Sequence, residues 1–136
     1  MQLQVLIASR IKAINPTARK LMRLLKRSCL PPQHEFAVET ALREALANAI
    51  VHGNHHDPSK KVRVRCGCDA VHGLWIAVRD EGAGFDPAVL ESPVLGENLA
   101  SEHGRGLLLI RWYMDEVRFE DRGREIFMRK SGSTSR

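Results

Sequence analysis

One row of polar residues, Glu44, Asn48 and His52, has the spacing of successive turns on one helical face. A carboxylate in such a row can take a proton from a hydroxyl group or position a water molecule. An asparagine oxygen is a hard, neutral ligand for Mg²⁺, an ion that keeps several waters and bridges substrate phosphates. The row therefore indicates acid–base and metal chemistry, although a salt-bridged glutamate and a surface asparagine on an ordinary helix would have the same spacing.

Two short glycine segments follow this row, and each has residues suited to a nucleotide. In Asp80-Glu-Gly82-Ala-Gly84-Phe85 a carboxylate ends an apolar run, where it can accept a hydrogen bond from an exocyclic amine such as that of adenine. The glycines let the backbone approach a flat ligand without a clash from a Cβ atom. In Gly104-Arg105-Gly106-Leu107 the glycines directly precede a predicted helix, whose first N–H groups favour phosphate oxygens, and Arg105 adds positive charge. A tight turn or a glycine-rich helix start would explain either segment alone.

The apolar pattern of the chain predicts the elements that must position these residues. We expect helices where apolar residues recur at helical spacing, and strands where they alternate with polar residues. The expected elements are a strand Gln2–Ile7, helices Asn15–Arg27 and Gln33–His52, strands Val62–Cys66 and Leu74–Arg79, a helix Gly104–Met114, and strands Val117–Glu120 and Glu125–Arg129. Asn15 is the expected N-cap of the first helix, with Pro16 as its first residue. Residues 86–103 lack periodicity and are expected to form a mobile loop, with one short helix inside it as the alternative.

These elements together predict a single fold class. Their order indicates an α/β (α+β) two-layer sandwich, in which a mixed, largely antiparallel sheet carries helices on one face. The chain has 136 residues, of which 43% are hydrophobic, and this suffices for one core. We therefore expect a single domain over residues 1–130 and a disordered polar tail over residues 131–136. No apolar run reaches the roughly 18 residues of a membrane helix, and the sequence shows no secretory signal.

Positive charge is concentrated at the start of the chain. Net charge is +5, and the first 34 residues hold seven Lys or Arg and no Asp or Glu. A solvated face is the ordinary interpretation of such a run, and a docking face for an acidic partner or for the transcription machinery is the alternative. Direct DNA binding is not expected, because the sequence shows no base-reading helix and no aromatic platform. The basic residues of the first predicted helix are Arg19, Lys20, Arg23, Lys26 and Arg27.

The cysteines and the large aromatic residues have ordinary structural interpretations. Cys29, Cys66 and Cys68 form an odd number without the spacing of a disulfide framework, so reduced thiols in a cytoplasm are expected. Cys66-x-Cys68 is also too closely spaced for a zinc site, and buried thiols are expected even though histidines lie nearby in the sequence. Trp75, Trp112 and Tyr113 are expected in the core or at interfaces.

Taken together and in this order, the polar row and the glycine segments resemble the motifs of the GHKL (Bergerat-fold) ATPase superfamily. Its N box is similar to Glu44-x-x-x-Asn48-Ala-x-x-His52-Gly53, and its first glycine box to Asp80-x-Gly82-x-Gly84-Phe85. Its second glycine box is similar to Gly104-x-Gly106-Leu107-x-Leu109-Ile110. Within the superfamily, Phe85-Asp86-Pro87 and Met114-Asp115-Glu116-Val117 are typical of bacterial anti-sigma-factor serine kinases. The resemblance covers roughly residues 5–130, which is nearly the whole chain.

The resemblance implies a role for each matching residue. Glu44 would be the general base, Asn48 the Mg²⁺ ligand and Asp80 the residue that reads adenine. Residues 86–103 would form a lid over the phosphates. The residues that would shape the ATP pocket or contact the nucleotide are His52, Gly82, Gly84, Phe85, Gly104, Arg105, Gly106 and Leu107.

The resemblance also implies a reaction and its partners. The γ-phosphate of ATP, bound with Mg²⁺, would pass to a serine on a small STAS-type anti-sigma-antagonist protein. A sigma factor is the second implied partner and a homodimer the implied assembly, whereas neither nucleic acid nor a membrane is expected as a direct partner. Two alternatives stay open, namely a nucleotide-gated binding module that has lost turnover and a stand-alone ATPase domain of a two-component or phosphatase pathway.

Overall fold

The computed structural model describes residues 2–71, 73–84 and 102–131, with the backbone alone described for residues 102–104. The strands are β1 (Gln2–Ala8), β2 (Lys61–Asp69), β3 (Gly73–Arg79), β4 (Glu116–Glu120) and β5 (Glu125–Lys130). The α-helices are α1 (Ile14–Ser28), α2 (Glu35–Ala47) and α5 (Glu102–Tyr113). Short 3-10 turns at Ile11–Ala13 and Pro32–His34 precede α1 and α2, and a π-helical segment, Asn48–Gly53, continues α2. No helix among the described residues is long and apolar enough to cross a membrane.

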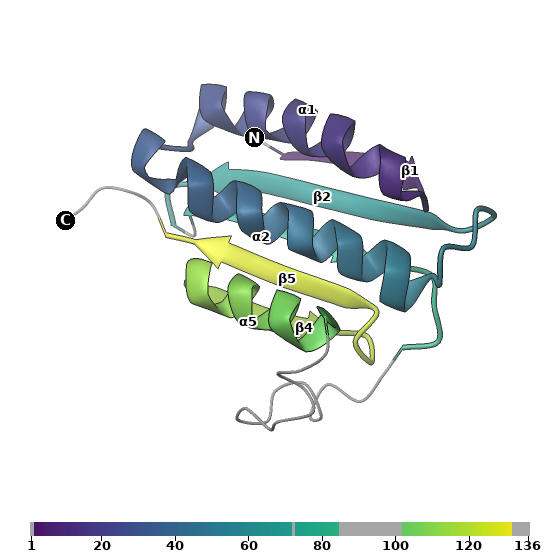
Figure 1. Ribbon diagram of the computed structural model, residues 1–136. Coiled ribbons are helices and arrows are strands. Elements are labelled where there is room, and N and C mark those ends of the chain that lie inside the picture. Colours follow the sequence, from purple (N-terminus) through teal and green to yellow (C-terminus); the bar gives the residue numbers. More distant parts are fainter. Residues whose placement is uncertain (1, 72, 85–101, 132–136) are drawn as a thin grey trace.

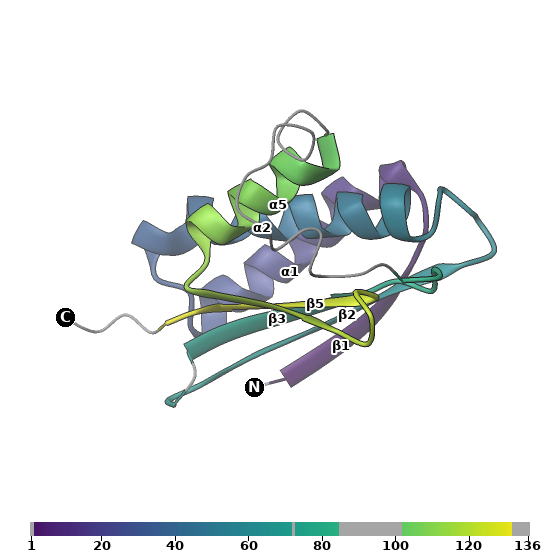
Figure 2. The ribbon, with the colours of Figure 1, turned by 90° about the horizontal axis from the view of Figure 1, so that it is seen from below.

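The five described strands form one sheet in the order β1-β2-β3-β5-β4, and every pairing is antiparallel. The three helices lie side by side on one face of this sheet, with α2 between α1 and α5 (Figures 1 and 2). The predicted two-layer α+β sandwich with helices on one face is therefore confirmed, and its described pairings are all of the antiparallel kind.

The alternation of β2 and β3 decides which side chains enter the core. Val64 pairs with Val78 and Cys66 with Ile76, and all four side chains are buried on the helix-covered face. The residues between them point to the open face of the sheet, where Arg63 pairs with Arg79. The helices fill the core from above with the fully buried side chains of Leu21, Leu25, Leu42, Leu46 and Ile110.

The large aromatic residues lie outside the centre of the core, and an interface role for Trp75 and Trp112 stays a prediction. Trp112 lies on the outer side of α5 and is 82% exposed, so it is not a core residue. Trp75 lies on the open face of the sheet, where it stacks on Phe127 with ring centroids 6.1 Å apart. Tyr113 makes an edge contact with Phe36 of α2, at 5.6 Å between centroids, so it contributes to the contact between α5 and α2.

The expected N-cap at Asn15 is also wrong, because the helix begins earlier. The N-cap residue of α1 is Ala13, which makes no side-chain cap. The preceding 3-10 turn already engages the first N–H groups, since the Ala13 N–H donates to Arg10 O at 2.9 Å and the Ile14 N–H to Ile11 O. Asn15 instead accepts a hydrogen bond from the Arg43 guanidinium of α2, so it joins the two helices.

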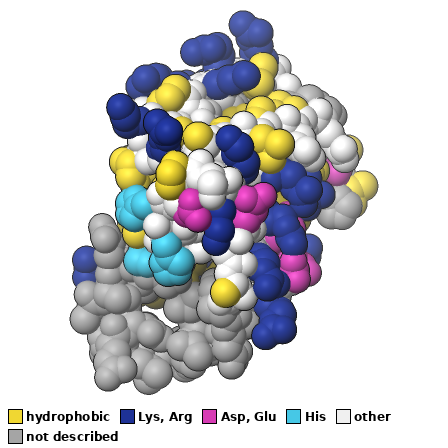
Figure 3. Space-filling view, turned by 90° about the vertical axis from the view of Figure 1, so that its right-hand side faces the viewer, with side chains coloured by type: hydrophobic (Ala, Val, Ile, Leu, Met, Phe, Trp, Pro, Cys, Tyr) yellow, Lys and Arg dark blue, Asp and Glu magenta, His cyan; other side chains and the backbone are white. Residues whose placement is uncertain are grey.

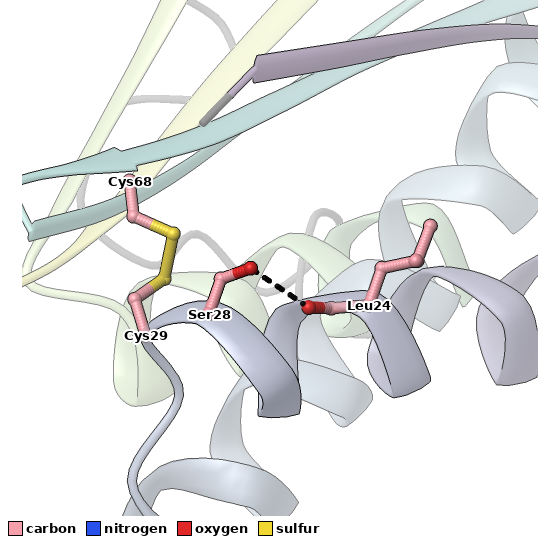
Figure 4. The surroundings of a disulfide bond; sticks show 4 residues. All are labelled: Leu24, Ser28, Cys29 and Cys68. Atoms are coloured by element: carbon pink, nitrogen blue, oxygen red, sulfur yellow. Dashed lines mark hydrogen bonds between the residues drawn. A yellow bond between two sulfur atoms is a disulfide. The ribbon is translucent and has the colours of Figure 1, made fainter.

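Two of the three cysteines are not reduced thiols, contrary to expectation. Cys29, the C-cap residue of α1, forms a disulfide with Cys68 of β2, and their Cα atoms are 6.2 Å apart (Figure 4). Cys66 is the buried free thiol that was expected. Both Cys66 and Cys68 face the helices, because residues two apart in a strand lie on the same side of the sheet.

Candidate functional site

The end of α2 changes from α-helix to π-helix at Asn48. The Asn54 N–H donates to Ala49 O, five residues back, at 2.8 Å, and the His56 N–H donates to Ile50 O at 2.8 Å. π-helical turns are rare and occur frequently at functional sites. A π turn holds more residues than an α turn. Residues spaced four apart therefore lie on one face at Glu44 and Asn48, but His52 is rotated away from that face. His52 lies in the wider turn with its side chain exposed.

Glu44 and Asn48 meet α5 at Gly106. A Cβ atom at Gly106 would lie 2.6 Å from Glu44 Oε1 and 3.6 Å from Asn48 Oδ1. A side chain at position 106 would displace the Glu44 carboxylate from its present position, so the missing Cβ lets both polar groups lie against the helix. The structure therefore brings the first polar row and the second glycine segment together, although 58 residues separate Asn48 from Gly106 in the chain.

The second glycine segment does not precede a helix, contrary to expectation. α5 begins at Glu102, so Gly104, Arg105 and Gly106 lie inside its first two turns. The N–H groups that an α-helix leaves unbonded at its start belong to its first four residues, so the N–H group of Gly106 is not among them. Arg105 is exposed, whereas Leu107 is buried in the hydrophobic core with only 5% of its surface accessible.

Asp80 is a buried carboxylate at the end of β3. Its Oδ1 accepts the Gly82 N–H at 2.7 Å, and its own N–H donates to Arg124 O at 2.9 Å. A Cβ at Gly53 would lie 2.2 Å from Asp80 Oδ2, and a Cβ at Gly82 would lie 2.1 Å from Gly53 O. Burial raises the pKa of Asp80, against the lowering effects of the Gly82 N–H and the Arg124 charge. Gly53 and Gly82 thus leave the space beside the Asp80 carboxylate free of Cβ atoms.

Arg124 holds the first glycine segment, a role that the sequence did not predict. From the β4–β5 turn its Nε donates to Gly82 O at 2.9 Å and its Nη2 to Ala83 O at 3.1 Å. Gly84, at φ 85°, packs against the same turn, where a Cβ would lie 2.6 Å from Arg122 O. The segment is therefore shaped by contacts with a distant hairpin turn as well as by its own glycines.

Asn54 is a second residue whose role the sequence did not predict. It follows the π-helical segment and is fully buried. Its Nδ2 donates to Lys61 O at 3.0 Å, and its Oδ1 accepts the Glu81 N–H at 2.8 Å. These bonds join the end of the helix to β2 and to the residue after Asp80.

Several expected features of the site lie outside the described residues. Phe85 and most of the expected loop 86–103 belong to this part of the chain, apart from the helical backbone at 102–103. Exposed histidines, His52, His55 and His56, follow the end of α2, and Figure 3 shows histidine side chains gathered on this side of the molecule. Among the described residues, no group of three or more His, Cys, Asp or Glu side chains is arranged to hold a metal ion.

The basic residues of α1 form a second surface of interest. The side chains of Arg19, Lys20, Arg23, Lys26 and Arg27 are all exposed. Lys and Arg side chains gather along the upper edge of Figure 3, which is the α1 side of the molecule in Figure 1. Lys26 forms an ion pair with Glu35 of α2 at 3.4 Å, so part of this charge is compensated within the chain.

Comparison with known proteins gives these features a family. Residues 7–130 match the family described as the histidine kinase-like ATPase domain. The chain is 27% identical to the anti-sigma F factor of Oceanobacillus iheyensis, over 98% of this chain and 84% of that protein. It is 31% identical to the anti-sigma F factor of Geobacillus stearothermophilus over 69% of this chain and 67% of that protein, and 30% identical to that of Clostridium perfringens strain 13 over 71% and 72%. The chain therefore belongs to the histidine kinase-like ATPase family, and within that family it is similar to the anti-sigma F factors.

Proposed function

We propose that this protein is an ATP-dependent protein serine kinase of the anti-sigma-factor type, which phosphorylates a small STAS-type antagonist protein and regulates a sigma factor. The observation that carries the proposal is the packing of Glu44 and Asn48 against Gly106. A carboxylate and an amide oxygen lie together there, beside a helix that carries the second glycine segment. Membership of an ATPase family supports the use of ATP, and the names of the similar proteins support the partners.

The described residues fit ATP and Mg²⁺ at two places. The first is the cradle at Asp80, where any Cβ at Gly53 or Gly82 would fill the space beside the carboxylate. A carboxylate with one oxygen engaged by the Gly82 N–H retains acceptor capacity for the exocyclic amine of adenine. The second is the contact of Glu44 and Asn48 with Gly106, where the amide oxygen is a suitable Mg²⁺ ligand. Bound ATP with Mg²⁺ supplies the phosphoryl group and neutralises the charge that develops on it.

Each residue then has a defined task in the proposed reaction. Asp80 would orient the adenine base, and Asn48 would hold the Mg²⁺ ion. Glu44 accepts the proton of the incoming serine hydroxyl, as a carboxylate one turn from the metal ligand can do. His52, Phe85, Arg105 and Leu107 are proposed nucleotide contacts, together with Gly84 and Gly104, and for Leu107 its burial favours a supporting position behind the pocket.

The proposed partners follow from charge and from the similar proteins. The exposed basic face of α1 suits an acidic protein surface, because opposite charges speed association and select the partner. A cytoplasmic location and a homodimeric assembly, with no direct contact to nucleic acid or membrane, complete the proposal.

The test replaces Glu44 with a residue of the same shape. We expect Glu44→Gln to slow transfer of labelled phosphate from ATP to a purified STAS-type antagonist roughly 10²–10⁴-fold while ATP affinity changes less than about threefold. The matched control is Glu39→Gln on the same helix, since Glu39 pairs with Arg43 and not with the site. An antagonist with its serine replaced by alanine serves as the acceptor control.

Two results would contradict the proposal. Transfer at the wild-type rate by Glu44→Gln would remove Glu44 from the mechanism. A wild-type chain that binds ATP and transfers nothing to the serine would favour the nucleotide-gated binding module instead.

A further inference from the structure

The disulfide between Cys29 and Cys68 closes a segment that carries the proposed catalytic residues. The two cysteines are 39 residues apart in the chain, and the segment between them contains α2 and the π-helical segment. Glu44 and Asn48 both belong to this segment. Figure 4 shows the bond joining the end of α1 to β2, directly before the chain turns toward α2. The bond therefore fastens one end of the segment to the strand at its other end.

The fold holds both cysteines in place by contacts that do not depend on the bond. The Cys29 N–H donates to Leu25 O at 2.9 Å, as part of the helix end. Cys68 pairs with Leu74 in the β2–β3 ladder. The Cα separation of 6.2 Å lies within the usual disulfide range, so the bond needs no movement of the backbone. Two reduced thiols at these positions would remain neighbours.

The third cysteine is excluded from exchange by its burial. Cys66 is fully buried, and burial raises the pKa of its thiol to about 11. The thiolate is the form that attacks a disulfide, so Cys66 stays inert at neutral pH. Cys29 and Cys68 are each partly exposed, and reagents in solution can reach them. Cys29 and Cys68 can therefore exchange with thiols in solution, and Cys66 does not compete with them.

We propose that Cys29 and Cys68 form a reversible thiol–disulfide site that reacts with low-molecular-weight disulfides and, when oxidised, fastens the end of α1, just before α2, to β2. One cysteine thiolate attacks a small disulfide, forming a mixed disulfide and releasing one small thiol. The other cysteine thiolate then attacks the protein sulfur of the mixed disulfide and releases the second small thiol. Two protein thiols are oxidised and one small disulfide is reduced to two thiols, which take up the two protons.

Oxidation is expected to act on the stability of the segment that carries the site. Closing a loop of this length removes conformational freedom from the unfolded chain, and removing such a bond lowers the melting temperature by roughly 10 °C or more. The same bond is expected to make opening of α2 away from the sheet less frequent. While the bond is intact, the chain before α2 stays attached to β2. This site would link the redox state of the surroundings to the order of Glu44 and Asn48.

The test equilibrates the full chain in buffers of reduced and oxidised glutathione and reads three properties that need no nucleotide. We expect one alkylatable thiol after denaturation of the oxidised chain and three after denaturation of the reduced chain. We also expect a melting temperature higher by roughly 10 °C in the oxidised state, with slower amide hydrogen exchange in α2. Cys29→Ser and Cys68→Ser should lose the redox dependence, whereas Cys66→Ala should retain it.

Three alkylatable thiols in the oxidising buffer would show that the pair does not form. A disulfide that forms without a change in melting temperature or in α2 exchange would show that it fastens nothing. Because none of these readouts involves ATP, failure here leaves the proposed kinase function untouched, and failure of phosphoryl transfer leaves this proposal untouched.

Discussion

The Asp80 carboxylate packs directly on Gly53, so closely that a Cβ at that glycine would lie 2.2 Å from Oδ2. Gly53 ends the π-helical segment that continues α2, and Asp80 directly follows β3. This contact places the end of the helix that carries Glu44 and Asn48 against the first glycine segment. Gly53 is therefore required by close approach to a neighbouring side chain.

Replacing Gly53 with alanine tests this contact. We expect Gly53→Ala to push the Asp80 carboxylate out of position and to weaken binding of a fluorescent ATP analogue by about tenfold, since one misplaced hydrogen bond to a buried partner costs about 1–3 kcal/mol. The control is Val71→Ala, at a residue that is 83% exposed. An affinity for Gly53→Ala within twofold of wild type would separate Asp80 from adenine binding.

Arg124 offers a test of how the first glycine segment is held. Arg124→Met keeps the length of the side chain and removes the donors to Gly82 O and Ala83 O. We expect a loss of about 1–3 kcal/mol in the free energy of unfolding, measured in urea, because two carbonyl contacts to a charged donor are lost. Arg122→Met makes the same change of charge at an exposed position of the same turn and should change stability by less than about 0.5 kcal/mol. Equal effects of the two variants would show that the contacts of Arg124 contribute nothing specific.

Replacing Asn54 is expected to lower stability more than replacing Arg124. Asn54→Ala would leave the Glu81 N–H and Lys61 O without their partner at a fully buried position. We expect the free energy of unfolding to fall by about 2 kcal/mol or more, from the urea midpoint at constant slope. Asn15→Ala, on the exposed side of α1, should cost less than about 1 kcal/mol. A variant as stable as wild type would mean that water replaces the side chain without loss.

Asp80 also predicts a pH dependence of stability. Burial raises the pKa of Asp80 in the folded chain above its unfolded value. The folded chain then binds this proton more readily, so the contribution of Asp80 to stability is present below the unfolded pKa and is lost as pH rises through the folded pKa. The free energy of unfolding of wild type and of Asp80→Asn is measured in urea from about pH 3 to pH 7. We expect the variant to gain stability relative to wild type as pH rises. A constant difference, or a shift toward wild type, would contradict the assigned effect of burial.

The sequence was informative where one periodic pattern decides the structure. Alternation of apolar and polar residues predicted strands at Val62–Cys66 and Leu74–Arg79, and both strands form. The π-helical segment was not predictable, because its longer hydrogen-bond spacing leaves no mark on the apolar pattern of α2. The predicted start of α5, Gly104, lies two residues too late. The glycines at 104 and 106 indicate a helix start more strongly than Glu102 and His103 do.

The contacts that complete the site were not predictable for a different reason. Arg124 is 42 residues from Gly82, and the pairing of Cys29 with Cys68 spans 39. Such contacts depend on which turn and which helix end the finished fold brings together, and no local spacing encodes them. The motif residues Glu44, Asn48 and Gly106 were identifiable because each motif is local, while their convergence needed the fold.

The most direct test of the central claim is calorimetric titration of the wild-type chain and of Asp80→Asn with Mg-ATP. A carboxylate can accept from both the Gly82 N–H and adenine, whereas an asparagine side chain has only one acceptor oxygen. The account predicts saturable binding of one nucleotide per wild-type chain and a loss of at least about tenfold in affinity for Asp80→Asn. A wild-type chain without saturable binding, or a variant that binds Mg-ATP as tightly as wild type, would contradict it.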